Sequence, residues 1–115
     1  MQLVDVVKLY YLAVDKGDVP GLLDLFSDGA TYLRPGYPPL VGHADLREFY
    51  VNQRVISEGR HTCTQLLSVG DQVAVRGEFA GLTREGGWLH LEFADFFRGG
   101  ERIAWRQTFF YTPLA

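Results

Sequence analysis

The stretch FADFFRGGERIAWRQTFFY, residues 93–111, contains two aromatic-rich runs separated by a Gly-Gly turn. Runs of this kind around a short glycine turn predict a pair of antiparallel β-strands. Side chains alternate between the two faces of a strand, so Phe93, Asp95 and Phe97 are expected to share one face. Asp95 is then the one charged group on an apolar surface, where burial disfavours its charge.

The position of Asp95 allows two interpretations. Without a cation beside it, a buried carboxyl is protonated near neutral pH and can act as an acid or a hydrogen-bond donor. Alternatively, Asp95 is a structural carboxylate that is paired with an arginine such as Arg34 or Arg76, or it faces solvent after a bulge near the turn. The distance from Asp95 to these arginines therefore distinguishes an acid from an ion pair.

The second half of the chain is rich in β-forming residues, in runs separated by GD, REGG and GGE turns. This pattern predicts an antiparallel meander with strands over residues 62–69, 72–83, 88–98 and 102–111. The predicted strands carry apolar residues on both faces, whereas three short helices can cover only one concave face. We therefore expect a homodimer through the convex face of the sheet.

The first half is predicted to be mainly helical. Apolar residues at three- and four-residue spacing predict a helix over residues 4–16, with Gly17 as its C-cap. Asp18 is the expected N-cap of a second short helix, which extends to Phe26. The elements that follow are a short strand in ATYLR, a proline-rich loop that runs to His43, and a third helix with Leu46, Phe49, Tyr50 and Gln53 on one side.

The composition fits one soluble domain. The chain has 115 residues, 47% hydrophobic and 22% charged, and we predict a single domain over residues 1–115. A formal charge of -3, with scattered basic residues, argues against binding to nucleic acid. The charged amino-terminal segment argues against a signal peptide or a membrane partner. One cysteine, Cys63, fits a cytoplasmic location. No metal is expected, because His43, His61 and His90 lack metal-site spacing.

Three stretches together resemble the NTF2-like superfamily, and more narrowly its SnoaL-like branch. They are VDKGDVPGLLDLFSDGATY (residues 14–32), PPLVGHADLREFY (38–50) and the stretch over 93–111. Relatives in this branch are the ketosteroid isomerases, the limonene epoxide hydrolases and the polyketide cyclases. The resemblance implies an α+β cone, in which a curved antiparallel sheet wraps the N-terminal helices and leaves an apolar pocket for a small, largely apolar organic ligand.

The isomerase pattern matches this chain in part. Tyr10 falls on the tyrosine of the first helix, and Asp95 falls on the aspartic acid of the oxyanion hole. The aspartate that serves the isomerases as general base is replaced by Arg34. An arginine cannot abstract a proton at neutral pH, so the resemblance does not carry over the complete isomerase mechanism.

The epoxide-hydrolase pattern is also incomplete. Tyr32 and Arg34 fall on two residues that position water, and Arg76 and Glu78 match the arginine and the first aspartate of an Asp-Arg-Asp triad. The second aspartate falls on Gln107, which cannot exchange protons. Arg76 and Glu78 share one face of a strand, and an exposed ion pair on the outer face is the alternative to a catalytic role.

These observations predict a cofactor-independent acid/base enzyme of isomerase, cyclase or epoxide-hydrolase type. Its substrate would be a small, largely apolar carbonyl, enol or epoxide compound. The alternative is a non-catalytic small-molecule-binding or dimerisation module of the same fold. The candidate catalytic residues are Asp95, Glu78, Arg76 and Tyr10, and the candidate substrate-binding residues are Tyr32, Arg34, Trp105, Gln107 and Phe93. Trp105, Gln107 and Phe109 are expected to share the face of Ile103, either as pocket wall or as core.

Overall fold

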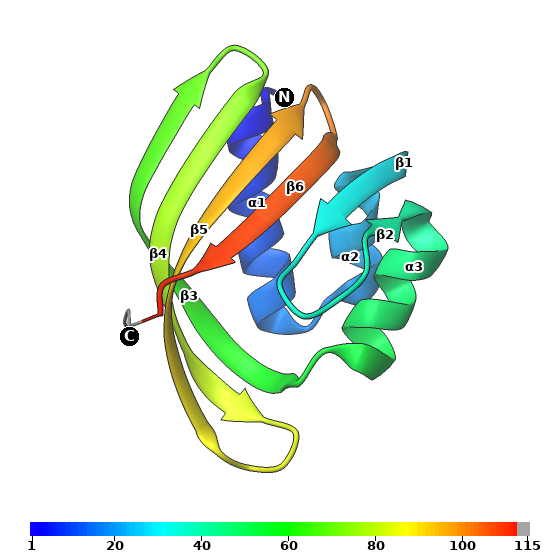
Figure 1. Cartoon of the computed structure of the whole chain (residues 1–115). Coiled ribbons are helices and arrows are strands. Elements are labelled where there is room, and N and C mark those ends of the chain that lie inside the picture. The colour runs from blue at the N-terminus through cyan, green and yellow to red at the C-terminus, as the bar shows by residue number, and fades with distance from the viewer. Residues whose placement is uncertain (113–115) are drawn as a thin grey trace.

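The computed structural model describes residues 1–112, so the last three residues of the predicted domain lie outside the described part. Three helical segments precede a long meander (Figure 1). The order of elements is α1 (Leu3–Lys16), α2 (Val19–Asp24), β1 (Phe26–Leu33), β2 (Leu40–Val41), α3 (Gly42–Glu48) with a π-helical turn η1 (Phe49–Gln53), β3 (Ile56–Val69), β4 (Gln72–Thr83), β5 (Trp88–Gly99) and β6 (Ile103–Phe110).

The first helix confirms the expected boundaries. Gln2 and Asp5 form a reciprocal capping box at the start of α1, which satisfies free backbone N–H groups there. Gly17 ends the helix with a φ of 71°, a left-handed conformation that glycine adopts without a steric penalty. The apolar stripe of α1 is buried against the sheet, and its members are Leu3, Val6, Val7, Tyr10, Tyr11 and Val14.

The second helix is shorter than predicted. Asp18 caps it as expected, since its side chain accepts a hydrogen bond of 3.0 Å from the backbone N–H of Gly21. The helix ends at Asp24, however, and Phe26 opens strand β1 instead of closing a helix. Phe26 pairs with Ile103 of β6 in parallel fashion, so pairing with a distant strand overrides the local helical pattern.

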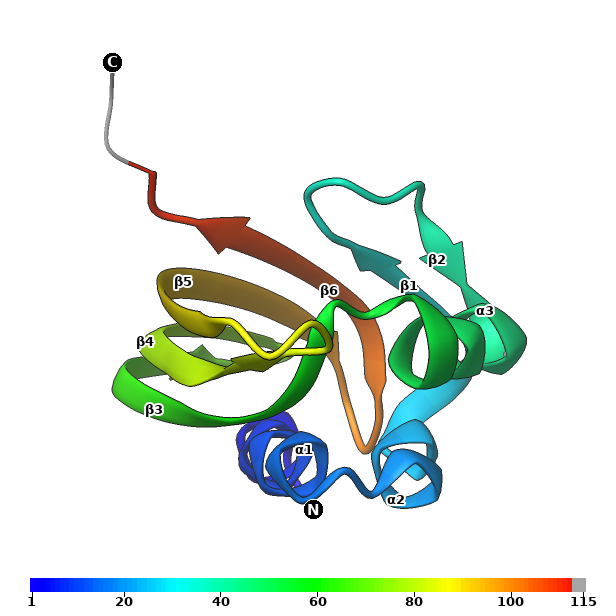
Figure 2. The same cartoon turned by 90° about the horizontal axis from the view of Figure 1, so that it is seen from below.

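All six strands form one curved, unclosed sheet in the order β2-β1-β6-β5-β4-β3. The predicted meander is confirmed, with β3, β4, β5 and β6 in antiparallel succession. Strand β3 is longer than expected because it begins at Ile56 and continues through two irregularities in its pairing with β4. The helices lie on the concave side of the sheet, with α1 along its inner face, as Figure 2 shows from below. The architecture is therefore the predicted α+β fold.

Strand β6 contains an irregularity that changes which side chains face the core. Trp105 pairs with Arg98, but Ile103 pairs with the adjacent residue Gly99, so Ala104 is an extra residue in β6. A β-bulge of this kind shifts the alternation by one. Ile103 and Arg106 both face the core as a result.

The convex face of the sheet carries exposed apolar side chains. It is hollowed by a shallow groove of about 570 Å³ across β3 to β6. The large apolar residues that line this groove and remain exposed are Leu67, Val69, Phe96 and Phe109. No helix among residues 1–112 combines the length and the apolar character needed to cross a bilayer.

Candidate functional site

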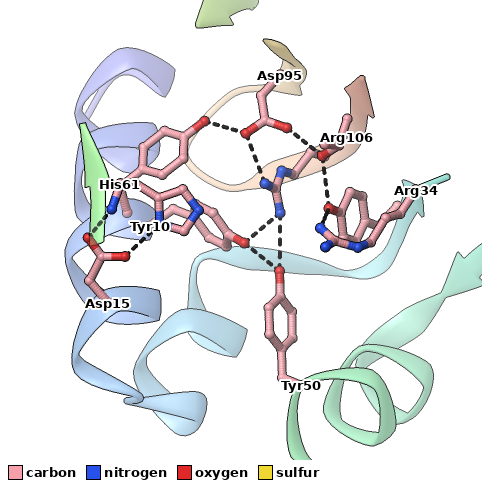
Figure 3. A network of polar contacts seen from close by, with 10 residues as sticks. Tyr10, Asp15, Arg34, Tyr50, His61, Asp95 and Arg106 are labelled. Atoms are coloured by element: carbon pink, nitrogen blue, oxygen red, sulfur yellow. Dashed lines mark hydrogen bonds and ion pairs between the residues drawn. The ribbon is translucent and has the colours of Figure 1, made fainter. Parts of the chain in front are cut away.

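Asp95 lies at the centre of a polar network inside the cone (Figure 3). Its carboxylate accepts hydrogen bonds at Oδ2 from Arg106 Nη2 at 2.9 Å and from the Tyr11 hydroxyl at 2.5 Å. The hydroxyl of Thr108 donates to Oδ1. The exposed fraction of Asp95 is 0%, so no space of the size of a water molecule adjoins it. Asp95 is therefore a sealed and fully hydrogen-bonded carboxylate.

The cation beside Asp95 is Arg106, not Arg34 or Arg76. Arg106 lies between the rings of Tyr10 and Tyr32, with Cζ 4.5 Å and 4.4 Å from their centroids. Burial opposes its charge, but the Asp95 carboxylate and the neighbouring tyrosine oxygens hold the pKa of Arg106 well above its usual range. Arg106 thus provides the ion pair that the structural interpretation of Asp95 requires.

Arg106 and Thr108 were missed in the sequence because of the bulge at Ala104. Strict alternation from Ile103 predicted that Trp105 and Gln107 face the inside of the cone. This prediction is wrong. The structure places Arg106 and Thr108 opposite Phe97 and Asp95, whereas Trp105 and Gln107 face the convex side. The Gly-Gly turn itself was the available signal. A bulge near this turn was considered for Asp95, and the same possibility should have been considered for the strand that follows the turn.

Two tyrosines extend the network beyond Arg106. Arg106 Nη1 donates to the Tyr10 hydroxyl at 2.5 Å and to the Tyr50 hydroxyl at 3.2 Å, and the two hydroxyls are 2.5 Å apart. Burial raises the pKa of both tyrosines, with the charge of Arg106 acting in the opposite direction. Both are neutral hydrogen-bond donors near pH 7. Tyr10 points into the cone as expected, and it contacts Asp95 only through Arg106.

Tyr32 and Arg34 approach the network from β1. The Tyr32 hydroxyl is 2.8 Å from Thr108 Oγ1, and Arg34 Nη1 donates to the same hydroxyl at 3.1 Å. Arg34 also lies over the rings of Phe49 and Phe110. The chain of contacts from Arg34 through Tyr32 and Thr108 therefore ends at Asp95.

Two predicted residues line a second, smaller cavity. Arg34 and Gln107 border about 220 Å³ of space beside the loop after β1, together with Thr108 and Phe109. Thr108 and Arg34 are the members of the network that border this cavity.

Arg76 and Glu78 do not join the site. They lie on the face of β4 opposite to Val75, which pairs with Asp95, and both are exposed. Glu78 Oε1 lies 3.6 Å from Nε2 of the exposed His90. The predicted position on the inner face is wrong, because the inner residues of β4 are the odd-numbered Val73, Val75, Gly77 and Phe79. Phe93, by contrast, is buried on the inner face as predicted.

A pocket of about 480 Å³ lies beside the C-terminal end of α1, where the helices meet the start of β3. We call it the end pocket. It is lined by Val14, Asp15, Lys16, Gly17, Val19, Leu22, Tyr50, Arg54, Ile56, Ser57, Glu58 and Arg84. Tyr50 is the member of the buried network that reaches this pocket.

Arg54 gives the end pocket a free cation. Its guanidinium lies 5.9 Å from the Tyr50 ring centroid and 6.0 Å from that of Phe79, and it forms no ion pair with any residue of the described range 1–112. Arg84 holds the backbone there, because its Nε and Nη2 atoms donate to the carbonyl oxygens of Arg54 and Val51 at 2.5 Å and 2.9 Å. The end pocket therefore presents a positioned guanidinium to any ligand that enters it.

The fold is shared with several solved structures. A polyketide cyclase candidate from Pseudomonas putida KT2440 superposes with a TM-score of 0.86 at 20% identity, over 96% of this chain and 92% of that protein. An NTF2-like protein from Burkholderia pseudomallei K96243 gives a TM-score of 0.83 at 20% identity, over 94% and 89%. SalBIII, an epoxide hydrolase/cyclase-like enzyme of salinomycin pyran ring formation, gives 0.83 at 21% identity, over 94% and 89%.

The sequence itself matches a family model. The match to the SnoaL-like domain spans residues 7–111, which includes every element from α1 to β6 except the first residues of α1. This range contains the buried network around Asp95 and Arg106 and the residues of the end pocket. The chain therefore belongs to the SnoaL-like domain family, with the NTF2-like fold that the three quoted stretches predicted.

Proposed function

We propose that this protein is a cofactor-independent acid/base enzyme that binds a small, largely apolar molecule in the end pocket. The ligand would carry a carbonyl, enol or epoxide oxygen, held by the Arg54 guanidinium and the Tyr50 hydroxyl. The observation that carries the proposal is the position of Arg54, which lines the pocket beside Tyr50 and forms no ion pair with the described residues.

The contacts of Tyr50 suit it to donate a hydrogen bond. Arg106 donates to the Tyr50 oxygen at 3.2 Å, which leaves the Tyr50 proton for another acceptor. When the Tyr10 hydroxyl donates to the same oxygen, the Tyr50 proton is not used in that contact, and in this proposal it is the proton that a ligand accepts. Positioned donors that meet a developing oxyanion stabilise the transition state more than the ground state.

Asp95 and Tyr10 would then act as positioning residues. Asp95 fixes and neutralises Arg106, and Tyr10 fixes the Tyr50 hydroxyl. This role differs from direct proton donation, for which the sealed carboxylate of Asp95 has no access to a ligand.

The size and lining of the end pocket support a small organic ligand. Its volume of about 480 Å³ lies in the range of about 300–1,000 Å³ typical of ligand sites. Val14, Val19, Leu22 and Ile56 supply apolar wall, whereas the charged side chains of Asp15, Lys16, Arg54, Glu58 and Arg84 make the exposed lining mainly polar, so the ligand would present polar groups to them. The solved structures that share the fold include a polyketide cyclase candidate and an epoxide hydrolase/cyclase-like enzyme.

A non-catalytic binding protein is the second candidate. The observation in its favour is the pairing of Asp95 with Arg106 inside a sealed interior, which removes the most conspicuous acid from any reaction. The end pocket would then bind a ligand without turning it over.

A substrate screen with matched variants tests the proposal. Native mass spectrometry would identify ligands that copurify, and enolisable ketones and epoxides would be assayed for turnover. Arg54→Gln and Tyr50→Phe are expected to lower kcat by about 10²–10³-fold each. Arg47→Gln, on the exposed side of α3, and Tyr37→Phe, outside the end pocket, should retain activity. Binding without turnover across the panel would favour the second candidate.

A further inference from the structure

The Arg54 side chain has hydrogen-bond donors that the protein does not use. A guanidinium carries five N–H donors, and those of Arg54 donate to no residue of the described range 1–112. Within that range, Arg106 Nε is the one sealed side-chain nitrogen without a partner, so the nitrogen atoms of the half-buried Arg54 are open. Arg54 therefore offers a complete set of free donors at the wall of the end pocket.

The charged lining of the end pocket carries an excess of positive charge. Its three cations are Lys16, Arg54 and Arg84, and its two carboxylates are Asp15 and Glu58. Neither Lys16 nor Arg84 forms an ion pair with a residue of the described part of the chain. A formal excess of one positive charge favours a ligand with one negative charge.

The two carboxylates of the lining differ in what they contact. Asp15 is engaged by the protein, because Oδ1 lies 2.5 Å from His61 Nδ1 and Oδ2 accepts the backbone N–H of His61 at 2.9 Å. Glu58 is exposed and forms no ion pair among residues 1–112. Its charge repels a second anionic group on a ligand, so the lining disfavours dicarboxylates and phosphate monoesters.

The rest of the lining suits an apolar body. Val14, Val19, Leu22 and Ile56 border the same space of about 480 Å³ as Arg54. A carboxylate is the anion that matches one guanidinium edge with two parallel hydrogen bonds. The end pocket therefore combines a place for a single carboxylate with a place for a hydrocarbon chain or ring.

We propose that the ligand of the end pocket is a monocarboxylic acid with an apolar body, and that Arg54 binds its carboxylate. This inference rests on the proposed function, to which it adds the substrate class. A bidentate contact uses two of the donors of Arg54, so others are left for the reacting oxygen that it shares with Tyr50. An oxygen next to the carboxylate fits this arrangement best, as in a 2-oxo acid.

The test compares two compounds on the full chain by calorimetry. They are 2-oxo-4-phenylbutanoate and 4-phenylbutan-2-one, in which a methyl group replaces the carboxylate. The acid is expected to bind at least about tenfold more tightly, since hydrogen bonds to charged groups are stronger than neutral ones. This advantage should shrink between about 20 mM and about 500 mM NaCl. Inorganic phosphate at about 10 mM should not displace the acid.

Variants of the lining should change the affinity for the acid in opposite directions. Arg54→Gln is expected to weaken it at least about tenfold while the affinity for the ketone stays within about threefold, and Arg54→Lys should retain part of it. Glu58→Gln, at an exposed position, should tighten it about two- to threefold because a repulsive charge is removed. The matched control is Lys8→Gln, exposed on α1 and outside the end pocket, which should change neither affinity.

The possible outcomes separate this inference from the proposed function. Equal affinity of the wild type for the acid and the ketone overturns the carboxylate site, but the proposed function stands if Tyr50→Phe still lowers turnover of a neutral substrate. Selective binding of the acid that Arg54→Gln and Glu58→Gln both leave unchanged also overturns the site, because the carboxylate then lies elsewhere. Failure of the acid to bind overturns it as well, whereas turnover of a neutral compound in the substrate screen would preserve the proposed function.

Discussion

The guanidinium of Arg106 lies 2.9 Å from the carboxylate of Asp95, and both side chains are buried inside the cone. Removing one member of such a pair leaves an uncompensated buried charge, whereas removing both leaves none. We therefore expect Asp95→Asn to lower the free energy of unfolding by about 3–5 kcal/mol, the usual cost of breaking a buried pair. Urea denaturation monitored by circular dichroism measures this change.

The matched control is the double variant Asp95→Leu with Arg106→Met. It should recover a large part of the lost stability, because hydrophobic residues of similar volume often replace a buried ion pair without loss. A double variant that is less stable than Asp95→Asn would contradict this account of the pair.

His61 makes stability depend on pH. Burial lowers its pKa in the folded state from the ordinary value of 6.5, so the unfolded chain binds the proton more readily. Stability contributed by neutral His61 is present above about pH 6.5 and declines as pH falls toward the lower folded-state pKa. The Tm should therefore drop more steeply between pH 7.5 and 5.5 in the wild type than in His61→Gln. Parallel curves for the two proteins would show that His61 contributes nothing to this dependence.

The convex groove is expected to bind a second copy of the chain. The ring centroids of the exposed Phe96 and Phe109 are 5.8 Å apart, and these two rings form the aromatic centre of the groove. The same face carries Arg98 at the rim of the groove, and Arg76 and Glu78 nearby. A two-fold symmetric contact would cover the apolar groove of both copies and bring charges of both signs together. Light scattering should give twice the chain mass of 13.0 kDa.

Phe109→Glu tests that contact. It should yield a 13.0 kDa species, since burying a carboxylate in the groove is costly. Trp88→Ser, which removes an exposed aromatic outside the groove, should leave the mass unchanged. A monomeric wild type would disprove the dimer.

Gly77 allows β3 and β5 to pack closely around β4. A Cβ atom at this position would lie 2.5 Å from the Thr62 carbonyl oxygen and 2.8 Å from Phe93 Cζ. Gly77→Ala should therefore destabilise the protein by about 1–3 kcal/mol, as expected for overpacking. The control is Gly29→Ala in β1, where a Cβ would meet nothing within 4 Å. Equal stability of the two variants in urea would refute the packing argument.

Much of the fold follows from local sequence patterns. The apolar stripe of α1, the Asp18 cap and the turns of the meander all act over a few residues, so periodicity and turn chemistry could predict them. Phe26 was assigned to the wrong element because its pairing with Ile103 spans most of the chain. Such pairing leaves no mark on the residues next to Phe26.

The site was predicted less well, for a related reason. Asp95 was identified correctly as a buried carboxylate, but its partners Tyr11 and Arg106 could not be chosen without the bulge and the packing of α1. His61 Nδ1 lies 2.5 Å from Asp15 Oδ1 although the two residues are 46 positions apart in the sequence, and neither stands out by its neighbours. Arg76 and Glu78 are an error of another kind. The resemblance to the epoxide hydrolases favoured the inner face of the sheet for this pair, but the alternation of β4 puts both residues on the outer face.

The bulge at Ala104 decides which of two alternating sets of β6 residues faces the inside of the cone. The set that faces inward, Arg106 and Thr108, is polar and anchors Asp95, while Trp105 and Gln107 belong to the other set. Were β6 to pair regularly from Ile103 onward, Trp105 and Gln107 would face the inside of the cone, and Asp95 would remain there without the Arg106 cation and the Thr108 hydroxyl. The polar character of this interior therefore depends on the pairing register of β6 as well as on its residues. A shift of the bulge along the strand would change the side chains that surround Asp95 without any substitution.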